Sequence, residues 1–310
     1  DEPLDIGLID EASMLDDRQF ADLRELFRTL VLFGDPAQLA PVAGPGRMVF
    51  EDLPADDTLT LSRVHRQASD NPILDLSEAL GDPELDFSGF ETLLRRAAER
   101  DPRVVISPRA DAAAMARSPV LVWRNATRIR LIQAFRTAHG APADALLPGE
   151  PLVCDGIELP LKHRKRRMDL EARGLVKGAQ VIYLGPSNRP GFARLHVVGA
   201  AEGLGGCARD DPRVGVASII QIEAPDQPEP HILSAASMGA VFLHGAAVTI
   251  HKAQGSQWPS VQVFAPDLWA AAQSGRQDAG MPLWKRLAYV AVTRAEERLV
   301  WITRYALARP

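Results

Sequence analysis

The order of apolar and polar positions predicts an α/β sequence at the start of the chain. Residues 4–9 form a short apolar run typical of a buried strand, residues 17–27 have helical periodicity, and residues 29–33 form a second buried strand. A strand, a helix and a strand in such close succession form a parallel α/β unit. The mixed α/β pattern continues, with helices predicted over 72–80, 87–99 and 126–138 and a strand over 119–122.

The pattern of predicted helices and strands changes near residue 141. From there to about residue 233 the chain is rich in Gly and Pro and in short β-type runs, at 180–184, 193–198, 214–222 and 231–233. Short strands at this spacing predict a small barrel. The α/β pattern then resumes with strands at 247–250, 261–264 and 298–302 and a helix at 283–293. We therefore expect an all-β insert that interrupts an α/β domain.

Composition narrows the class of protein. The 310 residues, 46% of them hydrophobic, are enough for two or three domains with their own cores. A net charge of −5 argues against a protein that coats nucleic acid indiscriminately, although a narrow basic groove stays compatible with it. Cys154 and Cys207 form no C-x-x-C pair, so neither a disulfide framework nor a zinc site is indicated. Without an apolar run of membrane-spanning length or a signal peptide, we expect a cytoplasmic protein with no membrane contact.

One basic run stands out in the middle of the chain. Residues 162–167 read KHRKRR, which we interpret as a solvated loop, because most such runs are no more than that. Contact with nucleic acid is the alternative reading.

Carboxylates follow the first predicted strand at the point where ligands bind in open α/β sheets. Asp10 and Glu11 come directly after residues 4–9, and Gln38 follows the next strand in the turn GDPAQLAPV. One acid can hold Mg²⁺ while the other polarises an attacking water, and an amide nearby can detect a terminal phosphate. A helix start or a surface turn is the alternative reading for both segments. The shared sheet edge favours nucleotide hydrolysis.

Five segments in order resemble the motifs of superfamily 1 helicases. DEAS (10–13) resembles motif II, GDPAQLAPV (34–42) motif III, LSRVHRQ (61–67) motif IV, VTIHKAQGSQ (248–257) motif V and YVAVTRA (289–295) motif VI. The form TIHKAQGS and the β insert before it favour the RecD/Dda-like, 5′→3′ branch. Trp123-Arg124-Asn125 resembles the start of a further segment of this branch.

The resemblance implies an α/β fold of two RecA-like P-loop NTPase lobes, the first truncated, with an SH3-like β-barrel insert in the second. The implied boundaries are 1–62 for the remnant of the first lobe, 63–145 for the first part of the second lobe, 146–235 for the insert and 236–310 for the remainder of the second lobe. It implies an ATP-dependent DNA helicase that uses ATP and Mg²⁺ and binds single-stranded DNA.

The resemblance also assigns roles to individual residues. Asp10 would bind Mg²⁺, Glu11 would activate water, Gln38 would detect the γ-phosphate, and Arg66 and Arg294 would reach it from the second lobe, where a fixed guanidinium stabilises transition-state charge. Gly255 would lie against the nucleotide. Contacts to the strand, mostly at its phosphates, are implied for Thr249, His251, Lys252, Ser256 and Asn125.

The chain departs from the family pattern in one main respect. It contains no G-x-x-x-x-G-K-[ST] and no Gly-Lys dipeptide, so no phosphate-binding loop is present to cradle the phosphates. We interpret it as an incomplete motor, with a missing N-terminal segment or a protein partner supplying that loop. A helicase remnant that binds single-stranded nucleic acid without turnover is the alternative function. Gln257 is a smaller departure, since relatives usually carry glutamate there.

Overall fold

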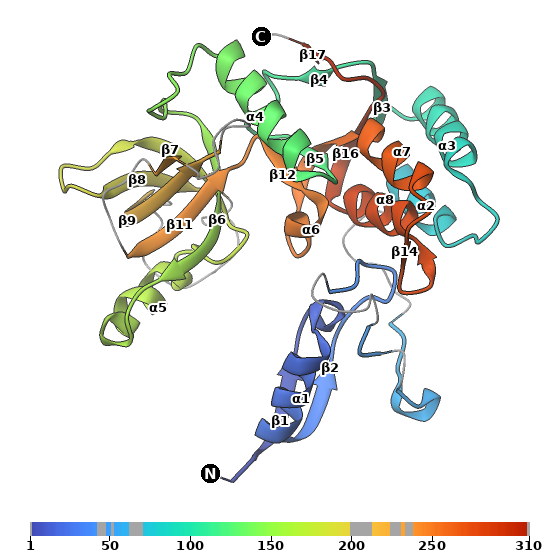
Figure 1. Ribbon diagram of the computed structural model, residues 1–310, viewed down its shortest axis with the longest axis horizontal. Helices are drawn as coiled ribbons and strands as arrows, with labels where there is room; N and C mark the ends of the chain where they lie inside the picture. The colour runs from blue at the N-terminus through green and yellow to red at the C-terminus, as the bar shows by residue number, and fades with distance from the viewer. Residues whose placement is uncertain are drawn as a thin grey trace.

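The computed structural model describes residues 2–41, 48–50, 53–61, 71–198, 213–223, 231–232 and 238–308. They form three parts: an N-terminal α/β unit, a larger parallel sheet with its helices, and a β barrel beside it (Figure 1). Among the described residues, no helix is long and apolar enough to cross a membrane.

The N-terminal unit has the predicted order of strand, helix and strand. β1 (Leu4–Ile9) pairs in parallel with β2 (Phe27–Leu32), and α1 (Asp17–Leu26) connects them. A capping box between Asp16 and Gln19 fixes where α1 begins, because each residue's side chain accepts from the backbone N–H of the other. Two short 3₁₀ turns follow the strands, η1 (Ala12–Met14) and η2 (Ala55–Asp57).

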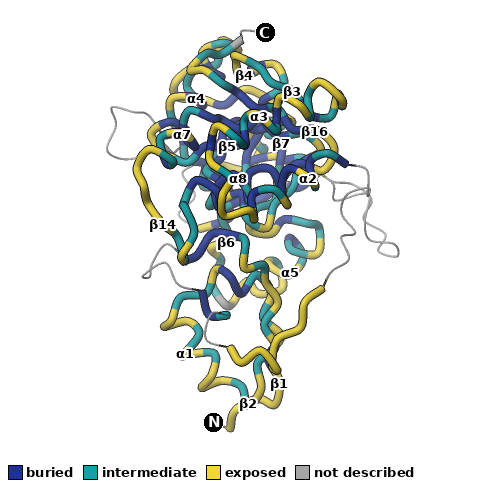
Figure 2. Tube along the Cα trace, turned by 90° about the vertical axis from the view of Figure 1, so that its right-hand side faces the viewer, coloured by how far each residue is buried: buried dark blue, intermediate teal, exposed yellow. Residues whose placement is uncertain are grey.

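The prediction that β1 is buried is wrong. The side chains of Leu4, Ile6 and Leu8 are 63%, 62% and 70% exposed, and Figure 2 shows the whole unit as mainly exposed. Within the described residues the sheet has two strands, and α1 has no buried residue. An apolar strand is buried only where other elements cover it, so apolar content alone did not determine its exposure.

The second part is a parallel five-stranded sheet in the order β12-β5-β13-β16-β3. Helices lie on both of its faces, which is the arrangement of a doubly wound α/β domain. Asn71 and Asp86 cap its first two helices. The strands are β3 (Val104–Ser107), β5 (Val120–Val122), β12 (Ala247–Thr249), β13 (Trp258–Phe264) and β16 (Ala295–Ile302), and the helices are α2 (Pro72–Ala79), α3 (Phe87–Arg100), α4 (Asn125–Ala138), α6 (Ile250–Ala253), α7 (Ala265–Gln273) and α8 (Leu283–Thr293).

Alternate side chains of this sheet enter two separate cores. Leu121, Val263 and Trp301 pack with α2, α3, α7 and α8, while Val122 and Phe264 pack under α4. This alternation follows from the two-residue period of a strand. Short pairs complete the domain, formed by β4 (Ala110–Asp111) with β17 (Leu307–Ala308) and by β14 (Gln277–Asp278) with β15 (Met281–Pro282).

The third part is the β barrel expected in the middle of the chain. Its strands run in the order β10-β9-β11-β6-β7-β8, and a further pairing of β8 with β9 closes the ring. The pairs are antiparallel except β9 with β11. The barrel sheet extends to His244, beyond the expected end at residue 235. Its strands are β6 (Pro151–Glu158), β7 (Gln180–Pro186), β8 (Phe192–Val197), β9 (Arg213–Ile222), β10 (His231–Ile232) and β11 (Gly239–His244).

The interpretation of the basic run as a loop is wrong. Residues 161–163 form a 3₁₀ turn, η3 (Leu161–His163), and α5 (Arg164–Ala172) follows directly. Leu170 on α5 and Leu175 just after it are buried in the barrel core, at 4% and 0% exposure. That apolar anchor holds a strongly charged segment as a helix, whose intrinsic polarity had indicated a loop.

Candidate nucleotide and strand-binding site

The two motif II carboxylates lie at the carboxyl end of β1. Asp10 is exposed, and its Oδ1 accepts a hydrogen bond of 2.9 Å from the Glu11 amide. Glu11 has a left-handed backbone conformation with a φ of 51°, which is costly for a residue with a Cβ. The Ala12 amide then donates to the Phe33 carbonyl at 2.9 Å, so the turn stays attached to the end of β2.

Motif III forms a tight turn directly after β2. Asp35 organises it, because its Oδ1 accepts from the Ala37 amide at 2.9 Å and its carbonyl accepts from the Gln38 amide at 3.1 Å. Its other carboxylate oxygen accepts from the hydroxyl of Tyr289 on α8 at 2.7 Å. Burial, and then the bond to Asp35 and its negative charge, raise the pKa of Tyr289, so the phenol stays a neutral donor. Gln38 is 8% exposed.

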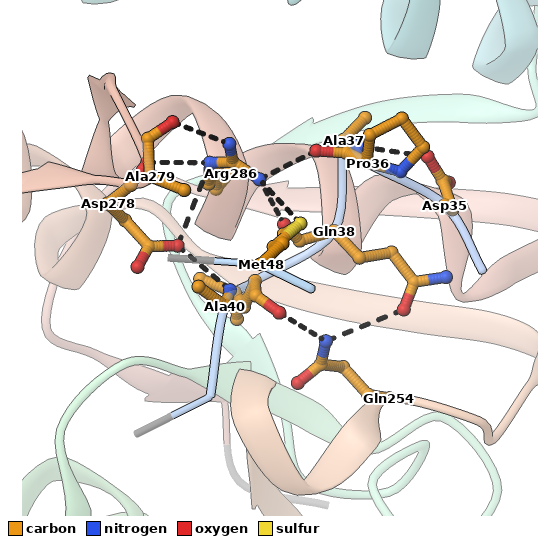
Figure 3. Close-up of polar contacts among 11 residues, drawn as sticks. Asp35, Pro36, Ala37, Gln38, Ala40, Met48, Gln254, Asp278, Ala279 and Arg286 are labelled. Atoms are coloured by element: carbon orange, nitrogen blue, oxygen red, sulfur yellow. Dashed lines mark hydrogen bonds and ion pairs between the residues drawn. The ribbon is translucent and has the colours of Figure 1, made fainter. Parts of the chain in front are cut away.

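Arg286 on α8 holds the same turn from the other side (Figure 3). Its guanidinium donates to the carbonyls of Pro36 and Gln38 at 2.7 and 2.5 Å, and also to the carbonyls of Asp278 and Ala279 at 2.8 and 2.9 Å. The Asp278 carboxylate in turn accepts from the Ala40 amide at 3.0 Å. One buried cation therefore joins the motif III turn to the β14–β15 hairpin.

Motif V connects the N-terminal unit with the parallel sheet. Gln254 donates through its side-chain amide to Gln38 Oε1 and to the Leu39 carbonyl, both at 3.4 Å. Gly255 has a left-handed φ of 78°, and a Cβ placed there would lie 3.9 Å from Glu11 Oε1. The structure thus brings Glu11, Gln38 and Gly255 together, three residues that the motifs had associated with the nucleotide.

Arg294, at the end of α8, is 3% exposed. Its guanidinium donates to the Val290 carbonyl at 3.1 Å, to the Ser256 carbonyl at 3.2 Å and to the Thr293 hydroxyl at 3.1 Å. Arg294 is therefore a buried residue and not a surface arginine. It also shows a contact that the sequence did not indicate, since Arg294 holds the backbone of motif V.

The expected strand-binding residues lie at or beside the carboxyl ends of adjacent strands. Thr249 ends β12 and pairs with Val122 at the end of β5, and Asn125 begins α4 three residues later. The Thr249 hydroxyl caps α6 by accepting from the Lys252 amide at 3.4 Å. Burial lowers the pKa of His251, despite a raising effect of Asp278, so this imidazole is neutral near pH 7.

The barrel contacts motif V at several points. The amino group of Lys252 donates to both carboxylate oxygens of Asp155 on β6, at 3.0 and 3.1 Å. The Ser256 hydroxyl donates to the Gly178 carbonyl at 3.4 Å, and the side-chain amide of Gln180 donates to the Gln257 carbonyl at 2.8 Å. The sequence had not associated Asp155 or Gln180 with the site.

A buried carboxylate supports the segment that begins at Trp123. Asp267 on α7 is 0% exposed and accepts from the amides of Trp123 and Arg124 at 3.1 and 2.9 Å and from the Thr127 hydroxyl at 2.9 Å. The Arg124 guanidinium donates to it at 2.5 Å. The sequence analysis did not name Asp267. Its signal there is an acidic residue within an otherwise apolar stretch.

The donor set near motif II fits a hard metal ion bound together with phosphate. Among the described residues there is no cluster of three or more His, Cys, Asp or Glu side chains that could enclose a metal by themselves. An exposed Asp10 matches Mg²⁺, which takes one or two carboxylates and completes its shell with water and phosphate oxygens. The buried Ser13 hydroxyl beside it has no hydrogen-bond partner there. Arg66 lies outside the described residues.

Two family models match separate parts of the chain. Residues 244–302 match the UvrD-like helicase C-terminal domain, and residues 2–105 match an AAA domain. These matches, at the two ends of an α/β chain with the motif contacts above, support the assignment to superfamily 1 helicases made from the motifs. No curated protein matches the chain.

Solved structures of Pif1 helicases share its fold. Pif1 from Candida albicans has a TM-score of 0.51 at 15% identity, over 98% of this chain and 75% of that one. Pif1 from Bacteroides bound to ssDNA has a TM-score of 0.54 at 12% identity, over 97% and 71%. The Bacteroides complex with ADP-AlF3 and ssDNA has a TM-score of 0.52 at 14% identity, over 96% and 70%. At these identities the likeness concerns the fold, and the parallel α/β arrangement of this chain matches the RecA-like lobes of Pif1 helicases.

Proposed function

We propose that this chain is the larger part of an ATP-dependent helicase motor that translocates 5′→3′ on single-stranded DNA and unwinds duplexes. The observation that carries the proposal is the position of motif V. Glu11 and Gln38 approach it from the N-terminal unit, and Arg294 holds the Ser256 carbonyl from α8. Residues suited to hydrolysis therefore touch the segment suited to holding the strand.

The roles follow the chemistry of each side chain. Asp10 binds Mg²⁺, which supplies charge neutralisation at the nucleotide phosphates when bound, and Glu11 orients or deprotonates the attacking water. Gln38 detects the γ-phosphate, and Gly255 allows close approach because it has no side chain. Arg294 stabilises the transferring phosphoryl group, for which its guanidinium must exchange the Ser256 carbonyl for phosphate oxygens. We assign the same role to Arg66.

The strand lies over the edge formed by Thr249 and Asn125 and over α6. His251 is neutral and half-buried, so it contributes a hydrogen bond or a stacking face rather than a charge. Lys252 and Ser256 bind phosphates, which suits a motor that is indifferent to sequence. The Lys252 amino group forms an ion pair with the Asp155 carboxylate, so a strand that binds Lys252 must displace this carboxylate.

A second function is favoured by one observation, the absence of a Gly-Lys dipeptide from the 310 residues. Without the backbone amides and lysine of a phosphate-binding loop, the polypeptide would bind single-stranded DNA and hydrolyse no ATP.

Phosphate release by the 310-residue chain, with and without single-stranded DNA, tests whether this polypeptide hydrolyses ATP by itself, which the second function excludes. We expect turnover at background level together with oligonucleotide binding that is lost in the double variant His251→Ala, Lys252→Ala. DNA-stimulated turnover that disappears in Glu11→Gln would instead establish hydrolysis by this polypeptide alone. A parent that neither binds an oligonucleotide nor hydrolyses ATP would refute both functions.

A further inference from the structure

The segment from Lys162 to Arg167 concentrates positive charge on the barrel. It holds five Lys or Arg side chains and one His in six positions, in a chain whose net charge is −5. Lys162, Arg164, Lys165 and Arg167 are all exposed. Four of the cations occupy the first turn of α5, where they oppose the positive end of the helix dipole. This arrangement costs stability in the free protein, and a bound polyanion would reverse that cost.

Two arginines from different elements converge on one aromatic ring beside this segment. The guanidinium carbons of Arg166 on α5 and Arg189 in the β7–β8 turn lie 5.0 and 4.2 Å from the centre of the Phe192 ring. Cation–π contact holds both arginines in place, although their like charges repel. The carboxylate of Glu171 forms an ion pair with Arg167 at 2.8 Å, which neutralises one of these positive charges. The surface is therefore preorganised for a ligand with several negative charges.

The position of β6 relates this surface to motif V. Asp155 contacts Lys252, and β6 continues from Asp155 to Glu158 before the chain enters η3. Seven residue steps separate Asp155 from Lys162 and span at most about 25 Å, or about seven nucleotides at a stacked spacing of about 3.4 Å each. A strand that contacts Lys252 can thus reach α5 without a long gap.

We propose that η3, the first turn of α5 and Arg189 form a second phosphate-binding surface, which holds the single-stranded DNA that extends beyond motif V. The proposal rests on the proposed function, because it needs a strand at motif V. Exposed lysine and arginine side chains attract the phosphates of successive nucleotides, and contacts of this kind carry no sequence information. The barrel then contributes to the length of the binding site and not only to its support.

The test removes three exposed cations that have no role in the nucleotide site. The variant Lys162→Ala, Arg164→Ala, Lys165→Ala is compared with the control Arg95→Ala, Arg96→Ala, Arg100→Ala, which removes the same charge from exposed positions on α3. Each 310-residue variant is titrated with single-stranded oligonucleotides of about 6 and about 20 nucleotides, lengths that bracket the expected site. Circular dichroism verifies that both variants fold.

We expect the α5 variant to bind the long oligonucleotide about tenfold or more weakly than the control does, with unchanged affinity for the short one. The slope of log affinity against log salt should fall by about 2, since three contacts contribute about 0.7 each on a single strand. Equal affinities and slopes for variant and control would overturn this inference while leaving the proposed function intact. The affinity for a duplex of the same length is measured as well. A larger loss of affinity for the duplex than for the single strand would also overturn the inference. A parent that binds neither oligonucleotide would overturn both proposals.

Discussion

Replacing Arg286 with alanine tests whether one buried cation couples the motif III turn to α8. The guanidinium is 5% exposed and donates to four carbonyl oxygens, two of them in the motif III turn. Gln38 is buried, so its carbonyl would stay without a donor, whereas the carbonyl of the exposed Pro36 can return to water.

The magnitude follows from these two contacts. A hydrogen bond from a charged donor contributes about 1.5–3 kcal/mol, and a carbonyl that water can reach again loses less than that. We therefore expect Arg286→Ala to weaken docking of the turn by roughly 2–4 kcal/mol, which is about 30- to 700-fold in the docking equilibrium. Arg286→Lys should recover only part of the loss, because a single ammonium cannot reproduce the planar fork.

Hydrogen exchange of a peptide covering residues 35–41 measures this directly. The alanine variant should lose protection at the amides of the turn, including the Ala40 amide that donates to Asp278. Arg276→Ala is the matched control, because Arg276 is an exposed arginine beside the same hairpin. Parental protection in Arg286→Ala, or the same loss in the control, would refute the reasoning.

Three further predictions concern the strand, the nucleotide and pH. His251→Ala with Lys252→Ala should weaken single-stranded DNA binding and make it less dependent on salt, as fluorescence titrations at low and physiological salt would show; unchanged binding would mean that motif V is misassigned. In any form of the protein that turns over ATP, Arg294→Ala should lower the rate by about 10³-fold with little rescue by Arg294→Lys, and a near-parental rate would exclude a role at phosphate. The free energy of unfolding should fall as pH drops below about 6.5. Burial lowers the pKa of His244 in the folded protein, so the unfolded chain binds a proton that the folded chain does not. Chemical unfolding of the parent and of His244→Gln between pH 5.5 and 7.5 should show that the stability of the variant depends less steeply on pH.

The assignment of His244 as neutral rests on its two hydrogen bonds. The Ala246 amide can only donate, at 3.2 Å, so Nδ1 accepts and Nε2 carries the proton that it donates to Glu150 at 2.8 Å. Glu150 also accepts from Arg136 at 2.9 Å, and its bonds to His244, Leu147 and Arg136 hold its pKa below the ordinary value despite burial. The carboxylate stays ionised near neutral pH, so acidification below pH 6.5 acts first on the histidine.

Sequence patterns predicted the elements well where periodicity and length agreed. The strand Leu4–Ile9 and the helix Leu283–Thr293 have the predicted ends. The strand β11 was not predicted, although its residues alternate between buried and partly exposed positions. Its pairing with β6 and β9 joins residues far apart in the chain, and such non-local pairing is what a local pattern cannot show.

The candidate site was predictable where residues stand in ordered motifs and not where they act across them. Glu11, Gln38 and Gly255 were named from the sequence, and the structure places them together. Arg286 and Asp155 were not named, because a cation on an amphipathic helix and a carboxylate on a strand look the same whether solvated or engaged. Only the fold shows that each meets a residue more than 90 positions away.

The barrel joins the rest of the chain through two strand ends that lie side by side. Leu152 at the start of β6 is the antiparallel partner of His244 at the end of β11, and the Gly245 amide donates to the Pro151 carbonyl at 2.8 Å. Entry and exit are therefore only about 5 Å apart, the usual spacing of paired Cα atoms. During evolution a short turn or a different domain could therefore replace the barrel. Such a replacement would not shift the register of β5 and β12 in the parallel sheet.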